Sequence, residues 1–150
     1  MKNILEKADV RALILQSLIN GGLEELYNCD CVMDLGDDKA NGMNYDKARA
    51  MIEKDMESGD YEGVMGSEMI CTEDVYIRMF EEFGLHFDDY TMGNIVLTPS
   101  KAKRNLQKAI DDDSWFLSEV LKVIPEYDDA DAYTYFNILQ GALFGEVIYG

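Results

Sequence analysis

The chain has 150 residues and a formal net charge of −17 at pH 7, and hydrophobic residues make up 47% of it. That hydrophobic share is too high for a disordered acidic segment, so we expect a folded single domain over residues 1–150 with a strongly charged surface. Nucleic acid and anionic membranes are excluded as direct partners, because both repel a surface of carboxylates. A basic protein surface or a cation remains as a partner.

The first half of the sequence predicts three helices and a long loop. Apolar residues recur at helical spacing from Val10 to Leu18, and the glycines that follow Asn20 end this helix. A short helix is expected over 23–27. Residues 29–44 have no clear period and predict a loop, with room for a short strand near its start. The next helix is expected over 45–58, with the side chain of the preceding asparagine as its N-cap.

The second half begins with a predicted helix that Thr72 caps and Gly84 ends. The segment 86–97 is expected to turn the chain, with a short strand at 94–97. Thr98 and Pro99 then form a strong helix start, because proline at the first helical position loses no hydrogen bond.

Two further helices complete the prediction. One begins near Asp113, turns Trp115 and Phe116 toward the core, and is closed by Pro125. The last is expected over about 128–149. The sequence therefore predicts a mainly α fold of six or seven helices, with room for a minor short β-hairpin.

The charge is unevenly distributed along the chain. Residues 55–90 carry a net charge of −10, whereas residues 91–108 carry +4. The bases Lys101, Lys103 and Arg104 lie in the first turns of the predicted helix that starts at Pro99, where the positive end of the helix dipole disfavours them. We expect these bases to pair with the acidic stretch 55–90.

Cysteine and histidine suggest a metal site only weakly. The three cysteines are an odd number and the N-terminal residues lack the pattern of a secretory signal, so we expect reduced thiols in a cytoplasmic protein. Cys29, Cys31, Cys71 and His86 could supply four zinc ligands, but no C-x-x-C pair supports this. A second hypothesis is therefore a divalent-metal-binding or helical adaptor module that uses the loop 29–46, with Asp34, Asp37 and Asp38 as the candidate ligands of a divalent ion.

No catalytic motif supports an enzyme. Ser100 and Lys103 match S-x-x-K without its companion motifs, and nothing around the single histidine, His86, suggests a catalytic partner. We therefore predict a non-enzymatic protein without a cofactor.

Acids and tyrosines recur together in four segments: 27–30, 59–63, 87–90 and 126–129. Carboxylates imitate phosphates for arginine and lysine, and tyrosine is a favoured interface anchor, so these segments predict a protein-binding face. Solvated acids beside amphipathic rings are the simpler alternative. The predicted partner-binding residues are Asp60, Glu62, Glu73, Asp74, Glu81, Glu82, Asp88, Asp89 and Tyr90.

In size, acidity and lack of catalytic motifs, the chain is similar at the level of class to small acidic inhibitors carried by phages and mobile elements, which include anti-restriction and anti-CRISPR proteins. That similarity implies a nucleic-acid mimic that blocks a nucleic-acid-handling enzyme. The leading hypothesis is a non-enzymatic acidic helical protein that binds the basic surface of such a partner. A helical adaptor or homo-oligomer remains an alternative.

Overall fold

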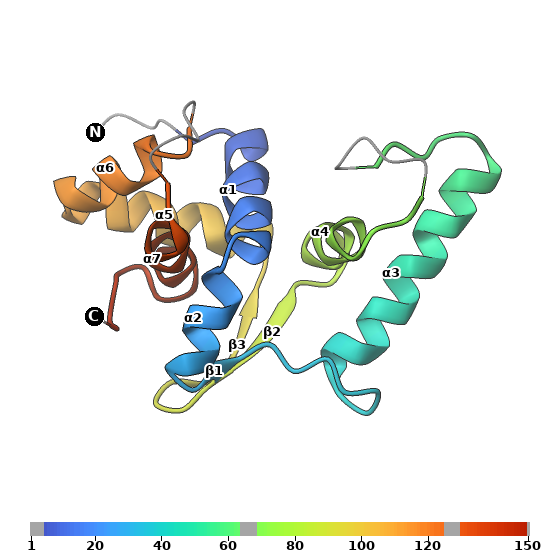
Figure 1. The fold of residues 1–150 in the computed structure, drawn as a ribbon, viewed down its shortest axis with the longest axis horizontal. Helices are drawn as coiled ribbons and strands as arrows, with labels where there is room; N and C mark the ends of the chain where they lie inside the picture. Colours follow the sequence, from blue (N-terminus) through green and yellow to red (C-terminus); the bar gives the residue numbers. More distant parts are fainter. Residues whose placement is uncertain (1–4, 64–68, 125–129, 150) are drawn as a thin grey trace.

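Seven helices and a three-stranded sheet form the part of the chain that the computed structural model describes, which is residues 5–63, 69–124 and 130–149 (Figure 1). The predicted mainly α fold with a small β-hairpin is thereby confirmed. In chain order the elements are α1 (Lys7–Ile19), α2 (Gly22–Asn28), β1 (Cys31–Val32), α3 (Ala40–Glu57), α4 (Thr72–Glu82), β2 (Leu85–Asp89), β3 (Gly93–Leu97), α5 (Pro99–Asp112), α6 (Ser114–Leu121) and α7 (Ala132–Phe144).

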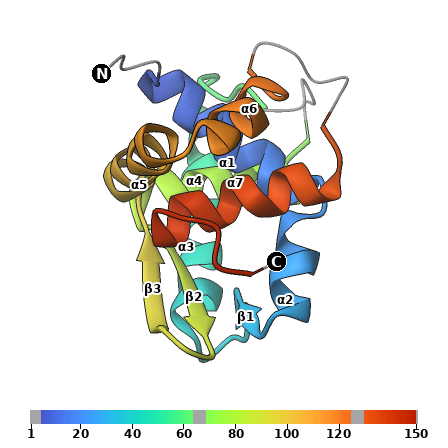
Figure 2. The same cartoon turned by 90° about the vertical axis from the view of Figure 1, so that its left-hand side faces the viewer.

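Helix α7 is the centre of the larger helical group. It packs against α1, α2, α5 and α6, and Figure 2 shows it lying across these helices. Most of its residues are buried, including the polar Thr134 and Gln140. Gly141 lets α6 approach closely, because a Cβ at this position would overlap the ring of the buried Phe116. The helix begins at its N-cap Asp131, whose carboxylate accepts a hydrogen bond from the Thr134 amide at 2.9 Å.

The sheet joins this group to the pair formed by α3 and α4. Its order is β1-β2-β3, and both pairings are antiparallel. Strand β2 contacts α3 and α4, and β3 contacts α7. Leu85 and Phe87 of β2 are fully buried, while Asp88 on the opposite face is exposed. This alternation follows from the two-residue period of a strand with one face on the core.

Several element boundaries differ from the sequence-based expectations. Helix α3 begins at Ala40 rather than after Asn44, so the loop before it is shorter than predicted. The side chain of the buried Asn41 explains the extension, because it accepts from the His86 amide at 2.9 Å and donates to the His86 carbonyl at 2.6 Å. Residues 86–89, expected as part of a turn, belong to the central strand β2, which starts at Leu85.

Other local predictions are confirmed or corrected at single residues. Thr98 caps α5 and Asp113 caps α6 as expected, but the N-cap of α4 is Cys71 rather than Thr72. Trp115 was expected in the core and is 48% exposed. The predicted helix end at Pro125 and helix start near 128 fall outside the described residues. None of the described helices combines the length and the apolar composition needed to cross a bilayer.

Candidate protein-binding surface

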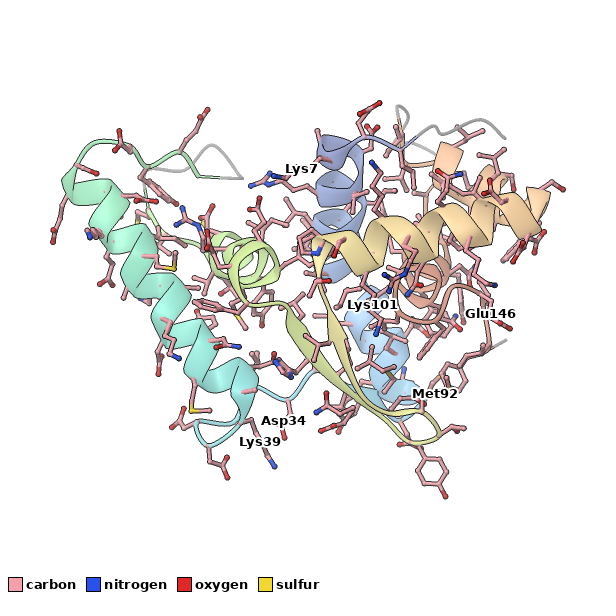
Figure 3. The ribbon with its side chains drawn as sticks, turned by 180° about the vertical axis from the view of Figure 1, so that it is seen from behind. Lys7, Asp34, Lys39, Met92, Lys101 and Glu146 are labelled. Atoms are coloured by element: carbon pink, nitrogen blue, oxygen red, sulfur yellow. The ribbon has the colours of Figure 1, made fainter. Side chains whose placement is uncertain are left out.

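The turn between β2 and β3 projects two large side chains into solvent. Tyr90, Thr91 and Met92 connect the strands, and Gly93 takes the positive φ of 78° that the turn requires. Tyr90 is 86% exposed and Met92 is 59% exposed. Figure 3 labels Met92 at this end of the hairpin.

The buried Asp89 stabilises the turn by accepting hydrogen bonds from its backbone. Its carboxylate accepts from the amides of Thr91 at 2.9 Å and Met92 at 2.7 Å, and from the Tyr149 hydroxyl at 2.6 Å. Burial raises the pKa of this carboxyl, but the hydrogen bonds from Tyr149, Met92 and Thr91 outweigh burial and lower it below its ordinary value. Asp89 was predicted as a partner-binding residue, and the structure instead buries it at 4% exposure as an ionised structural group.

The pairing of β1 with β2 brings two of the acid–tyrosine segments together. Val32 pairs with Asp88, and the amide of Tyr90 donates to the carbonyl of Asp30 at 3.0 Å. Segment 27–30 therefore lies beside segment 87–90. We call the exposed acids, tyrosines and methionine of these two segments and of the adjoining turn the hairpin surface: Tyr27, Asp30, Asp88, Tyr90 and Met92.

Sequence reasoning placed Asp88 and Tyr90 in the site but omitted the other three residues of the hairpin surface. The acid–tyrosine pattern of segment 27–30 was visible in the sequence. Its position beside Tyr90 was not, because that depends on a strand pairing between distant parts of the chain. Met92 carried no distinguishing pattern.

A second group of the predicted acids lines a pocket at the far end of α3 and α4. Asp60, Glu62, Asp74 and Glu81 line it together with Arg11 and Arg78, and its volume is about 140 Å³. The loop after α3 that carries Asp60 and the hairpin turn lie at opposite ends of the molecule in both Figure 1 and Figure 2. The nine predicted residues therefore do not form one continuous face.

Asp74 is also a structural group. It is 4% exposed and accepts from the Cys71 amide and from the Tyr61 hydroxyl, both at 2.8 Å. Burial, and then the bond to Asp74, raises the pKa of Tyr61 to about 12. Asp74 is thus part of the N-terminal cap of α4 and is not available to a partner.

The bases of α5 do not neutralise the acidic stretch as expected. Glu81 pairs at 3.4 Å with Arg11 of α1, and Asp55 pairs at 2.7 Å with Arg78. Within the described residues, Lys101, Lys103 and Arg104 form no ion pair. The same is true of the remaining exposed or half-exposed acids of this stretch, which are Glu57, Asp60, Glu62, Glu73, Glu82 and Asp88.

The proposed metal ligands do not converge. Across residues 5–63, 69–124 and 130–149, no three acidic, cysteine or histidine side chains form a group that could hold a metal ion. Cys31 is buried opposite Asp89, whereas Cys71 caps α4. Burial, and then the charge of Asp89, raises the pKa of the Cys31 thiol to about 12, which disfavours the thiolate that a metal needs.

Comparison with protein-family models, with curated proteins and with solved structures gives no match. The class of the protein therefore follows from its own fold and surface. It is an acidic, mainly α protein with a three-stranded sheet whose hairpin turn presents tyrosines and carboxylates.

Proposed function

We propose that this protein is a non-enzymatic binding protein whose hairpin surface engages a basic patch on a partner protein. The observation that carries the proposal is the meeting of segments 27–30 and 87–90 through the pairing of β1 with β2. Two separate acid–tyrosine segments thereby become one surface.

The chemistry of this surface suits a basic partner. Tyr27 and Tyr90 are 65% and 86% exposed, and amphipathic rings of this kind contribute much of the binding energy at protein interfaces. Asp30 and Asp88 are exposed and form no ion pair with the described residues, so their carboxylates are available to arginine or lysine. The net charge of −17 would also attract a basic partner over a longer range.

The partner class that fits this chemistry is a nucleic-acid-handling protein. Such proteins carry basic grooves that bind phosphates, and a row of carboxylates can replace the phosphates there. Small acidic inhibitors from phages and mobile elements, including those of the anti-restriction and anti-CRISPR classes, act on partners of this kind. Size and acidity support placing this chain among them.

The test is a pull-down from a lysate of the native host at low and high salt, followed by affinity measurement with the captured protein. We expect a basic partner whose affinity falls steeply between about 0.05 and 0.5 M salt, because screening shortens the reach of the charges. The double variant Asp88→Lys/Tyr90→Ala should weaken binding at least about tenfold.

A matched control separates the hairpin surface from the general charge. Glu57→Lys/Tyr133→Ala makes the same change in net charge and also removes an exposed tyrosine, but on α3 and α7. It should retain most of the affinity. A salt-independent complex, or equal losses in the two variants, would contradict the proposal.

A further inference from the structure

A second pocket with the opposite charge lies between α1, α4 and the start of α5. Its volume is about 340 Å³. Three basic side chains line it, from two helices: Lys7 and Arg11 of α1, and Lys103 of α5. Figure 3 labels Lys7 on α1, above the N-terminal end of α5.

The positive lining runs against the composition of the chain, which has 30 acids and 13 bases. The pocket has one acid, Glu81, and Arg11 pairs with it at 3.4 Å. Lys7 and Lys103 form no ion pair with any described residue. The pocket therefore has three basic side chains and one carboxylate, which leaves an excess of positive charge.

The position of Lys103 in α5 adds to the unfavourable positive charge of the pocket. It lies near the start of α5, where the helix dipole and the neighbouring bases both disfavour a cation. Lys103 forms no ion pair with a carboxylate of the described residues. An anion in the pocket would compensate for the positive charge, because it would interact favourably with Lys103 and with the positive end of the helix dipole.

The accessible lining of the pocket is mainly apolar. Val10 and Phe80 line it from the core at 2% and 1% exposure, so its accessible apolar surface comes mainly from the half-buried Pro99 and the alkyl stems of the three bases. A bare inorganic anion would leave this apolar lining uncovered. A volume of this size instead suits a small organic ligand that places an apolar body against this lining and its charge among the bases.

We propose that this pocket binds a small phosphate ester with an apolar or aromatic body, of the size of a nucleoside monophosphate. Lys7, Arg11 and Lys103 contact the phosphate, and Pro99 with the alkyl stems of these bases contacts the body. The site is independent of the hairpin surface, because the two attract ligands of opposite charge and lie on different elements.

The experiment is an NMR titration of the full, ¹⁵N-labelled chain at low salt with adenosine 5′-monophosphate, adenosine and inorganic phosphate as separate probes. We expect saturable shifts for the monophosphate at amides around Arg11, Phe80 and Lys103. Adenosine and inorganic phosphate should each bind at least about tenfold more weakly, because each lacks one half of the contacts. No saturable shift with the monophosphate, or equal affinity for inorganic phosphate, would overturn the proposal.

Charge reversals test the residues. Lys103→Glu should weaken binding of the monophosphate by about tenfold or more, and Lys7→Glu should do the same from the other helix. Lys101→Glu is the matched control, because Lys101 is in the first turn of α5 but does not line the pocket, and Figure 3 shows it on the other side of α5 from Lys7. It should change the affinity less than about threefold.

Misfolding is not expected to obscure these results. A glutamate near the start of α5 agrees with the helix dipole, so Lys103→Glu and Lys101→Glu should both keep the wild-type amide spectrum outside the substituted turn. Equal loss of affinity in the Lys103 variant and in the Lys101 control would refute the assignment of the phosphate to this pocket.

Discussion

Replacing Asp89 with asparagine keeps the shape of the side chain but removes its negative charge. The amides of Thr91 and Met92 and the hydroxyl of Tyr149 donate to this carboxylate at 2.9, 2.7 and 2.6 Å, and the thiol of Cys31 also donates to it. A hydrogen bond to a charged group contributes about 1.5–3 kcal/mol and a neutral one about 0.5–1.5 kcal/mol, so the bonds from the two amides and the hydroxyl together lose about 3 kcal/mol. Part of this loss is offset because a buried charge no longer has to be desolvated. We therefore expect Asp89→Asn to lower the free energy of unfolding at pH 7 by about 2 kcal/mol.

The stability difference between wild type and Asp89→Asn should depend on pH. Because the pKa of Asp89 is lowered in the folded state, its ionised form stabilises the fold above the unfolded pKa of about 3.9, and this contribution is lost as the pH falls through the folded pKa. The difference between wild type and Asp89→Asn should thus be complete at pH 7 and should narrow progressively below about pH 4.

Urea denaturation followed by far-ultraviolet circular dichroism at several pH values measures this difference. Tyr149→Phe serves as a companion variant, because it removes one donor and keeps the charge, and it should cost about 1.5–3 kcal/mol. Equal stability of wild type and Asp89→Asn at pH 7, or a difference that stays constant down to pH 3, would refute the account of Asp89 as an ionised structural group.

Three further predictions follow from other contacts. Gly141→Ala should lower the free energy of unfolding by about 2 kcal/mol in urea denaturation, because its methyl group would overlap the buried ring of Phe116; an unchanged midpoint would contradict this. Arg11→Ala should change stability by less than about 1 kcal/mol in the same assay, since both side chains of the pair with Glu81 are partly exposed; a larger loss would mean that the pair is shielded from solvent. Cys31 should be the last thiol alkylated at pH 8, as followed by peptide mass spectrometry, because its burial and raised pKa leave almost no thiolate; early modification would exclude a buried, protonated thiol.

Local chemistry was enough to predict the elements whose ends are set by neighbouring residues. Thr98 and Pro99 begin α5 and Asp113 caps α6, in each case through contacts within three residues along the chain. Gly84, with φ of 81°, follows the end of α4 as predicted. Such contacts can be read from sequence because the donor and the acceptor lie in the same short segment.

Contacts between distant segments account for what was missed. The extra turn of α3 depends on the bonds between Asn41 and His86, which are separated by 45 positions. Buried and more exposed residues alternate along β2, as expected for a strand. The segment also contains two adjacent aspartates, and this residue type is favoured in turns. The burial of Asp89 depends on Tyr149, 60 positions away. The alternation of Leu85 and Phe87 places Asp89 on their buried face and Asp88 on the other, but only once the segment is recognised as a strand.

Contacts between residues far apart in the sequence also explain which residues of the candidate site are exposed and which are buried. Asp88 and Tyr90 are exposed, as a partner-binding role requires, whereas the carboxylates of Asp74 and Asp89 accept internal hydrogen bonds. In the sequence, an internally hydrogen-bonded acid resembles an exposed one, because both have the same types of neighbouring residues. Only the arrangement in space tells them apart.

The internal bonds to Asp89 also bear on how fast and how strongly a partner could bind. Because Asp89 fastens the backbone of Thr91 and Met92, the loop that carries Tyr90 is already ordered before any encounter. In the proposed complex, little backbone entropy would then be lost when a partner docks, because the loop that carries Tyr90 is preorganised. Association should accordingly be fast and limited by electrostatic encounter, and the heat-capacity change on binding should reflect the buried interface alone, without a contribution from loop folding.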